Sequence, residues 1–253
     1  MKIESKGLIT MKKLISLITL SIALVMTSCE IPENLNDNPN EITVSDVDAN
    51  LFLNGAQLAN AIVQVSHLNR ISGMYSGQLV GYASLYSNIY GYSLSTVESN
   101  DEWFSAYVGV VSNTRHIQES APNDKLLVGI SQILEAHAIS SLALLMGDVP
   151  YTEINSDNDS PKFDNQSSVL DACSALLSDG ITTLSGASSR SEAYDIYFNG
   201  DKDKWIAAAH TLKARIALAK KDYASALSHA GSGISSSAGD MLYKPRGDAA
   251  TPN

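Results

Sequence analysis

Cysteine is scarce in this sequence, and its scarcity excludes one route to a stable fold. Only Cys29 and Cys173 occur among 253 residues, so a framework of several disulfide bonds is impossible. Cys173 lies near Ala172, Leu176 and Leu177, which favours a small buried side chain over a reactive nucleophile. The fold must therefore depend on an apolar core, and 44% hydrophobic with 17% charged residues is a globular composition.

Positive charge is also in short supply. The 17 lysines and arginines face 27 aspartates and glutamates, which leaves a formal net charge of −10. Nucleic-acid binding depends on neutralising phosphates with basic side chains, so this balance argues against a nucleic-acid partner. It argues equally against adhesion by charge to an anionic membrane surface.

Catalytic and metal-binding motifs are missing. The five histidines show no HExxH or similar spacing, and the chain has no Gly-rich phosphate loop, GxSxG motif or Cys/His pair. His137 lies in an apolar stretch and is predicted to be a hydrogen-bonded core residue rather than a ligand. Asp157 and Asp159 could begin a calcium loop, but Lys162 and Ser168 replace the glycine and glutamate of an EF-hand. We therefore predict a binding protein rather than an enzyme, with no cofactor and no metal.

The N-terminus carries the most specific signal. Met11-Lys12-Lys13 is a short basic region, and Leu14–Met26 is an apolar run that ends at small residues. The run is too short for the ~20 residues of a membrane span and is typical of a bacterial secretion signal. Cys29 follows Thr-Ser and resembles the lipobox cysteine, before which the signal is cut and whose thiol is diacylated. The alternative is an ordinary cleaved signal with an incidental cysteine.

We therefore divide the chain into three parts. Residues 1–28 are the expected signal peptide, with translation starting at Met11, and residues 29–44 are the expected lipidated tether. Within it, Glu30–Glu41 is polar, rich in Asn and Pro, and without period. Its acidic residues resemble the surface-export signal of Bacteroidetes lipoproteins, or form a simple solvated linker. Residues 45–253 are the expected folded domain.

No convincing alternating strand pattern occurs in that domain, so the predicted class is all-α. Lys125–Met146 is apolar nearly all round and should be the most buried helix. Three possible capping boxes should begin helices: Ser45-x-x-Asp48, Ser99-x-x-Glu102 and Ser168-x-x-Asp171.

Lys202–Ile234 is predicted to form two short helices with almost no linker between them. Each carries an apolar stripe at spacings of three and four: Trp205, Ala209, Leu212, Ile216 and Ala219, then Tyr223, Leu227, Ala230 and Ile234. A large aromatic residue early in the pair, with small residues deeper in it, is the tetratricopeptide pattern. One pair cannot bury its own apolar face. We therefore expect further pairs from the rest of the chain, in a right-handed superhelical array with irregular loops.

Tyrosine is concentrated in one glycine-rich segment, which contains Tyr75, Tyr82, Tyr86, Tyr90 and Tyr92. Tyrosine offers a flat apolar face for a sugar ring and a hydroxyl for its rim. The candidate ligand residues are Tyr82, Tyr86, Tyr90 and Trp103. The alternative is that these rings pack between helices, and it is favoured for Trp103 and Tyr107 because they lie on one helical stripe.

Several short motifs together carry a family resemblance. They are Asp37–Asn40 (DNPN), Gly147–Tyr151 (GDVPY), Pro161–Asp164 (PKFD), Lys204-Trp205 and Leu212–Arg215 (LKAR). In this order behind a lipobox, from Cys29 to the end, they resemble the SusD/RagB family of outer-membrane nutrient-binding lipoproteins of Bacteroidetes. Family members are close to double this length, so the chain resembles their N-terminal portion.

The resemblance implies a function without catalysis. A family member covers a SusC-like TonB-dependent outer-membrane transporter, binds an oligosaccharide or another nutrient, and delivers it to the pore, while outer-membrane lipid holds its acylated N-terminus. A second hypothesis is a tetratricopeptide-type scaffold that binds a peptide or protein. A lipid anchor and a neighbouring gene for a TonB-dependent barrel would favour the first.

Overall fold

The computed structural model describes residues 47–95, 100–154 and 160–244. The expected signal peptide, Cys29 and the tether lie outside this range, as do Ser99, Asp157 and Asp159. These described residues belong to one compact unit.

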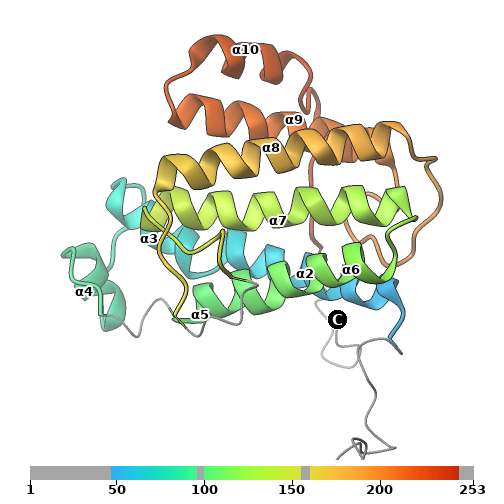
Figure 1. The fold of residues 1–253 in the computed structure, drawn as a ribbon. Coiled ribbons are helices and arrows are strands. Elements are labelled where there is room, and N and C mark those ends of the chain that lie inside the picture. The colour runs from blue at the N-terminus through green and yellow to red at the C-terminus, as the bar shows by residue number, and fades with distance from the viewer. Residues whose placement is uncertain (1–46, 96–99, 155–159, 245–253) are drawn as a thin grey trace, which may run out of the picture. The chain divides into compact units, whose positions relative to one another are not determined.

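The described part of the chain is helical (Figure 1). In chain order the helices are α2 (Ala49–Val65), α3 (His67–Tyr75), α4 (Leu85–Tyr90), α5 (Asn100–Phe104), the π-helical segment η2 (Ser105–Ser112), α6 (Asn113–Ser120), α7 (Lys125–Met146), α8 (Gln166–Ser185), α9 (Lys202–Ala219), α10 (Tyr223–Gly231) and the short 3₁₀ helix η3 (Ser237–Gly239). These residues contain no strand, and their only bridge joins Val149 to Asp164. The predicted all-α class is confirmed.

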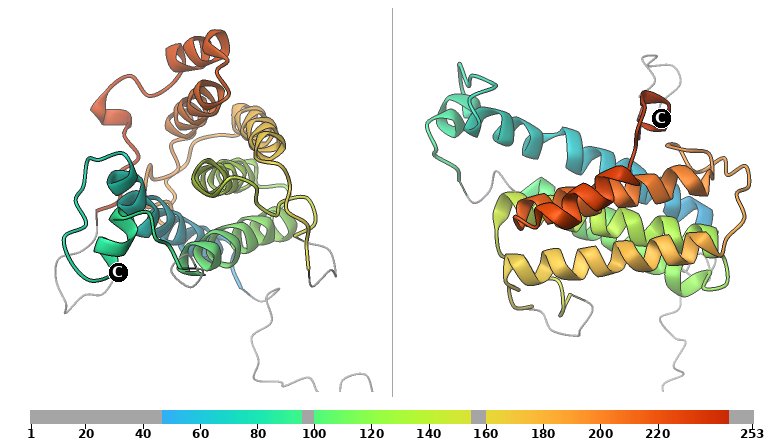
Figure 2. Two further views of the ribbon diagram at one scale, coloured as in Figure 1. Left: turned by 90° about the vertical axis from the view of Figure 1, so that its left-hand side faces the viewer. Right: turned by 90° about the horizontal axis from the view of Figure 1, so that it is seen from above.

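Helix α7 is the centre of the molecule, with the bounds that the sequence predicts. Helices α2, α6, α8 and α9 pack around it (Figure 2). Among the described helices only α7 is long and apolar enough to cross a membrane, and 83% of its most apolar stretch is buried inside the protein. Its apolar surface is therefore used by the core.

Helix α7 approaches α8 closely at a glycine. A Cβ atom on Gly129 would lie 2.5 Å from Cγ of Leu184, which is too close for two carbon atoms. Glycine at this position lets the two helices pack without displacing Leu184.

Two of the predicted helix starts are wrong by a few residues. Helix α2 begins at Ala49, and the Asp48 carboxylate caps it by accepting from the Asn50 amide at 3.0 Å. Helix α8 begins before Ser168, with Asn165 as its cap. Asp and Asn cap a helix at least as well as Ser does, and here they provide both caps.

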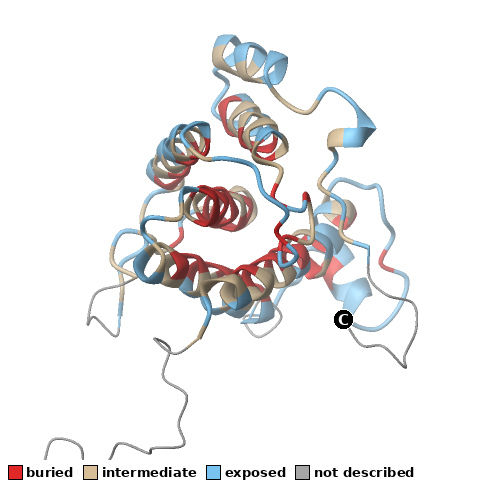
Figure 3. Ribbon diagram, turned by 90° about the vertical axis from the view of Figure 1, so that its right-hand side faces the viewer, coloured by how far each residue is buried: buried red, intermediate tan, exposed pale blue. Residues whose placement is uncertain are grey.

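The last helix pair is confirmed, but its second member is not buried. Trp205 of α9 is fully buried, whereas none of the residues of α10 is. In α10, Tyr223 is 66% exposed and Leu227 is 78% exposed. Figure 3 shows this contrast between α7 and α10. The pair packs on other helices, as expected, through α9, which contacts α7 and α8, while the outer stripe of α10 remains exposed in the described residues.

Cys173 is buried in the core, as predicted, and burial raises the pKa of its thiol to about 12. The thiol is thus protonated at neutral pH, which disfavours a role as nucleophile.

Candidate functional site

Residues 67–95 form a small lobe at one end of the helix bundle, which we call the tyrosine lobe (Figures 1 and 2). It contains α3, α4 and the turns around them. Ile71, Met74 and Ile89 form a buried cluster separate from the main core, and Leu145 of α7 packs against it. The lobe is therefore anchored to the bundle through a small core of its own.

The backbone of the tyrosine lobe is irregular, as its glycines predict. A Cβ atom on Gly81 would lie 1.8 Å from the carbonyl oxygen of Tyr86, so only glycine fits there. Ser84 and Tyr92 have positive φ angles of 55° and 59°. The ring of Tyr92 stacks on that of Tyr75, with centroids 5.0 Å apart. The stack of Tyr92 on Tyr75 holds the end of the lobe against α3.

The three candidate tyrosines of the lobe lie on its surface. Tyr82 is 93% exposed, Tyr86 37% and Tyr90 43%. The guanidinium of Arg70 lies 5.7 Å from the centroid of the Tyr86 ring, within the range of a cation–π contact. Tyr82 therefore stands clear of the helices, whereas Tyr86 and Tyr90 are each more than half covered and present only part of their rings to water.

Trp103 lies apart from the lobe, in an aromatic group with Tyr107 and Phe163 that we call the aromatic shelf. The Trp103 and Tyr107 rings are nearly parallel, with centroids 5.8 Å apart. The ring of Phe163 meets Trp103 edge-on at 6.3 Å. The Tyr107 hydroxyl donates to the Pro150 carbonyl at 2.6 Å, which fixes the shelf to the loop after α7.

Some rings of the aromatic shelf pack against the core, and one is exposed to water. Trp103 and Tyr107 are half-buried against the core, as the sequence favoured, while Phe163 is 65% exposed. Trp103 and Tyr107 border an open cavity of about 510 Å³. Its other walls include Val108, Pro150, Ile154 and Pro161. Such an apolar and aromatic lining suits one face of a sugar ring.

The GDVPY and PKFD motifs meet beside this shelf. Val149 and Asp164 pair as a two-residue bridge, with N–O distances of 3.2 and 3.0 Å. The Asp164 carboxylate accepts from the amides of Thr152 at 2.7 Å and Tyr151 at 2.8 Å. The bond from Thr152 does most to hold the pKa of Asp164 below its usual value. The carboxylate thus stays charged and holds the loop that carries Phe163.

A buried ion pair supports the same loop from inside. Arg115 binds Glu135 at 2.9 Å, and the Tyr151 hydroxyl donates to the same carboxylate oxygen at 3.1 Å. Burial and the Glu135 charge raise the pKa of Tyr151. Its hydroxyl therefore remains a donor at all physiological pH values.

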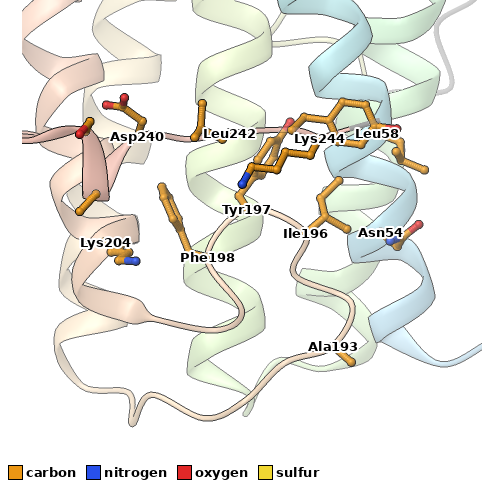
Figure 4. Close-up of a pocket in the computed structure, with 13 residues that line it drawn as sticks. Asn54, Leu58, Ala193, Ile196, Tyr197, Phe198, Lys204, Asp240, Leu242 and Lys244 are labelled. Atoms are coloured by element: carbon orange, nitrogen blue, oxygen red, sulfur yellow. The ribbon is translucent and has the colours of Figure 1, made fainter. Parts of the chain in front are cut away.

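A second cavity, of about 590 Å³, lies between α2 and the C-terminal segment (Figure 4). Asn54 and Leu58 line it from α2, Tyr197 lines it from the loop before α9, and Asp240 and Lys244 line it from the C-terminal side. Sequence reasoning missed this cavity because its walls come from three distant segments with no shared motif.

The remaining candidates for chemistry do not form a catalytic group. His137 Nδ1 lies 3.2 Å from Asn60 Nδ2 between α7 and α2, which confirms the predicted hydrogen-bonded core histidine. The described residues hold no group of three or more His, Cys, Asp or Glu side chains that could bind a metal ion.

Comparison with known proteins gives one family. The SusD-like family described as "Starch-binding associating with outer membrane" matches residues 39–244. No curated relative matches the sequence.

Several solved structures resemble this fold. A SusD/RagB family protein from Bacteroides thetaiotaomicron has a TM-score of 0.69 at 20% identity, over 77% of this chain and 44% of its own. A SusD-like protein from the same species has a TM-score of 0.61 at 22% identity, over 74% and 42%. A chitin-binding SusD homologue from Flavobacterium johnsoniae has a TM-score of 0.54 at 20% identity, over 73% and 43%. The chain thus spans less than half the length of each.

Proposed function

Because the chain belongs to the SusD-like family, we propose that it is a non-catalytic nutrient-binding lipoprotein of the cell surface. It captures an oligosaccharide and passes it to a SusC-like TonB-dependent transporter in the outer membrane. Cys29 carries the lipid that anchors it. The observation that carries this proposal is the exposure of Tyr82, Tyr86 and Tyr90 on a lobe braced by its own core.

Exposed tyrosines on a fixed support suit the binding of sugars. Each ring gives an apolar face at little cost in conformational entropy, because only two side-chain torsions must be ordered. The contact between Arg70 and Tyr86 limits the motion of that ring further. The lobe therefore presents aromatic rings that are already ordered before a sugar binds. This lowers the entropic cost of binding a sugar ring, which has only a small apolar face.

The aromatic shelf is a second part of the same proposal. Trp103 is held by Tyr107 on one face and Phe163 at its edge, beside a cavity with room for one or two sugar units. Figure 1 shows α4 and α5 toward the same end of the bundle. A glycan chain could thus use either surface.

The test is isothermal titration of the protein with chito-oligosaccharides, followed by a glycan array if they do not bind. The chitin-binding relative makes that glycan the first choice. We expect Tyr86→Ala, Tyr90→Ala or Trp103→Ala to weaken binding by about 1 kcal/mol or more. Tyr223→Ala is the matched control, because Tyr223 is an exposed tyrosine on α10. If Tyr86→Ala and Tyr90→Ala bind as tightly as the wild type, the lobe is not the site.

A tetratricopeptide-type scaffold for a peptide or protein is the second candidate. It is supported by Leu218, Tyr223 and Leu227, which are more than half exposed on α9 and α10. Peptide-array binding that is lost in Leu227→Asp, without glycan binding by the wild type, would favour it.

A further inference from the structure

Two histidines that are distant in the sequence face each other between α9 and α10. Nδ1 of His210 lies 3.1 Å from Nδ1 of His229. Their ring centroids are 5.3 Å apart and the rings are tilted by 30°. Both side chains are half-buried, so one side of the pair remains open to water. The two nitrogens therefore meet at the edge of a helix pair, within reach of a solute.

The separation of the nitrogens fits a bound metal ion as well as a shared proton. Imidazole nitrogens bind Zn²⁺ at ~2.0–2.1 Å. At that bond length, nitrogens 3.1 Å apart subtend an angle of about 100° at the metal. This angle lies between the tetrahedral arrangement of Zn²⁺ and the tetragonal one of Cu²⁺. To bind either ion, each ring must turn so that its Nδ1 lone pair points at the ion and not at the other nitrogen.

Burial keeps both imidazoles in the form that binds metals, because it lowers the pKa of each. The positive charge of Lys213 lowers both pKa values further, although the same charge also repels a bound cation. Both are therefore neutral at pH 7, the form that binds metals. Lys213 itself donates to the Ser174 carbonyl and the Ser178 hydroxyl of α8. Its ammonium group is thus occupied on another helix.

We propose that His210 and His229 form a two-histidine site for Cu²⁺ or Zn²⁺ that fastens α10 to α9. Water completes the coordination, since the described residues offer no third ligand of the usual kinds. Helix α10 has no buried residue, so a metal bridge would supply an attachment that apolar packing does not. Local spacing could not reveal this site, because its ligands come together only when the two helices pack.

The test is titration of the untagged protein with Cu²⁺, followed by calorimetry and electron paramagnetic resonance. We expect one Cu²⁺ per chain, with nitrogen hyperfine structure from two imidazoles. His210→Gln and His229→Gln should each weaken binding at least tenfold, because loss of one arm removes the chelate. Zn²⁺ should raise the melting temperature of the wild type and of neither variant.

Two control variants separate the site from adventitious binding. His116→Gln removes a half-buried histidine on α6, and Lys213→Met removes the adjacent charge while both imidazoles remain. His116→Gln should bind Cu²⁺ within threefold of the wild type, and Lys213→Met should bind it at least as tightly, because a positive charge near the ion is removed. Equal Cu²⁺ affinity in the wild type and in both His210→Gln and His229→Gln overturns the proposal and leaves the pair as a hydrogen bond.

Discussion

Trp205 joins α9 to the loop that precedes it. Its Nε1 donates to Asp195 Oδ2 at 2.8 Å, and the rings of Phe198 and Tyr197 meet it edge-on. We expect Trp205→Ala to lower the free energy of unfolding by ~3–5 kcal/mol. The change opens a cavity and removes a donor from a buried carboxylate. Urea denaturation followed by circular dichroism measures it.

Trp205→Phe separates the two effects. Phenylalanine keeps most of the ring but cannot donate to Asp195, so the loss should fall to about 1–3 kcal/mol. An unchanged midpoint for Trp205→Ala would contradict the packing described here.

His137 should make the protein sensitive to acid. Burial lowers the pKa of His137 to about 3, and the charge of Arg215 lowers it further. The unfolded chain takes up this proton below its ordinary pKa of ~6.5, whereas the folded chain does not. The stabilising contribution is therefore complete above pH ~6.5 and is lost as the pH falls toward 3. The slope is at most ~1.4 kcal/mol per pH unit.

His137→Gln tests that slope. Glutamine can still accept from Asn60 but does not titrate. Between pH 6 and 4, the free energy of unfolding of the variant should fall less steeply than that of the wild type. The difference in slope should be at most ~1.4 kcal/mol per pH unit, the value for one proton. Equal slopes in the two proteins would assign the acid sensitivity to other groups.

Among the elements, α7 depends on its N-terminal cap. The Asp124 carboxylate accepts from the amides of Leu126 and Leu127 at 3.2 Å each, and it binds Arg190 at 2.7 Å. We expect Asp124→Ala to cost ~1–2 kcal/mol, the usual value of a cap. Asp124→Asn keeps a capping oxygen and weakens only an exposed ion pair, so it should cost less than ~1 kcal/mol. Thermal melts of both variants measure the two losses of stability. Equal losses would mean that the ion pair with Arg190 is responsible and not the cap.

The sequence predicted the long elements better than the irregular ones. The bounds of α7 follow from Pro122 before it and Gly147 after it, and its burial follows from apolar residues on every side. The start of α8 was misplaced because Asn165 and Ser168 are both good caps. The π-helical segment η2 was missed, because a wider turn leaves no clear mark in residue spacing.

The candidate site was predictable only in part. Clustered tyrosines and glycines indicated an irregular aromatic segment, and the structure places Tyr82 and Tyr86 on its surface. Which rings face water depends on the fold around them, since the local pattern also allowed packing between helices. The cavity beside Asp240 depends entirely on tertiary structure.

At the scale of the whole molecule, the proposed anchor gives a direct test. Cys29→Ala removes the thiol that would be acylated, so we expect loss of labelling by a palmitate analogue. The protein should then accumulate as an uncleaved or soluble form. Cys173→Ala is the control, because Cys173 is buried in the core. Equal labelling of the Cys29→Ala protein would contradict the lipobox.

The exposure of α10 also has a kinetic consequence. A helix without buried residues gives up little contact area when it detaches, so it can open while the rest of the protein stays folded. The turn before it contains Lys221 in a left-handed conformation, φ 63°, beside exposed Lys220. Transient opening would present this dilysine to trypsin-like proteases. A nick between α9 and α10 would then precede global unfolding.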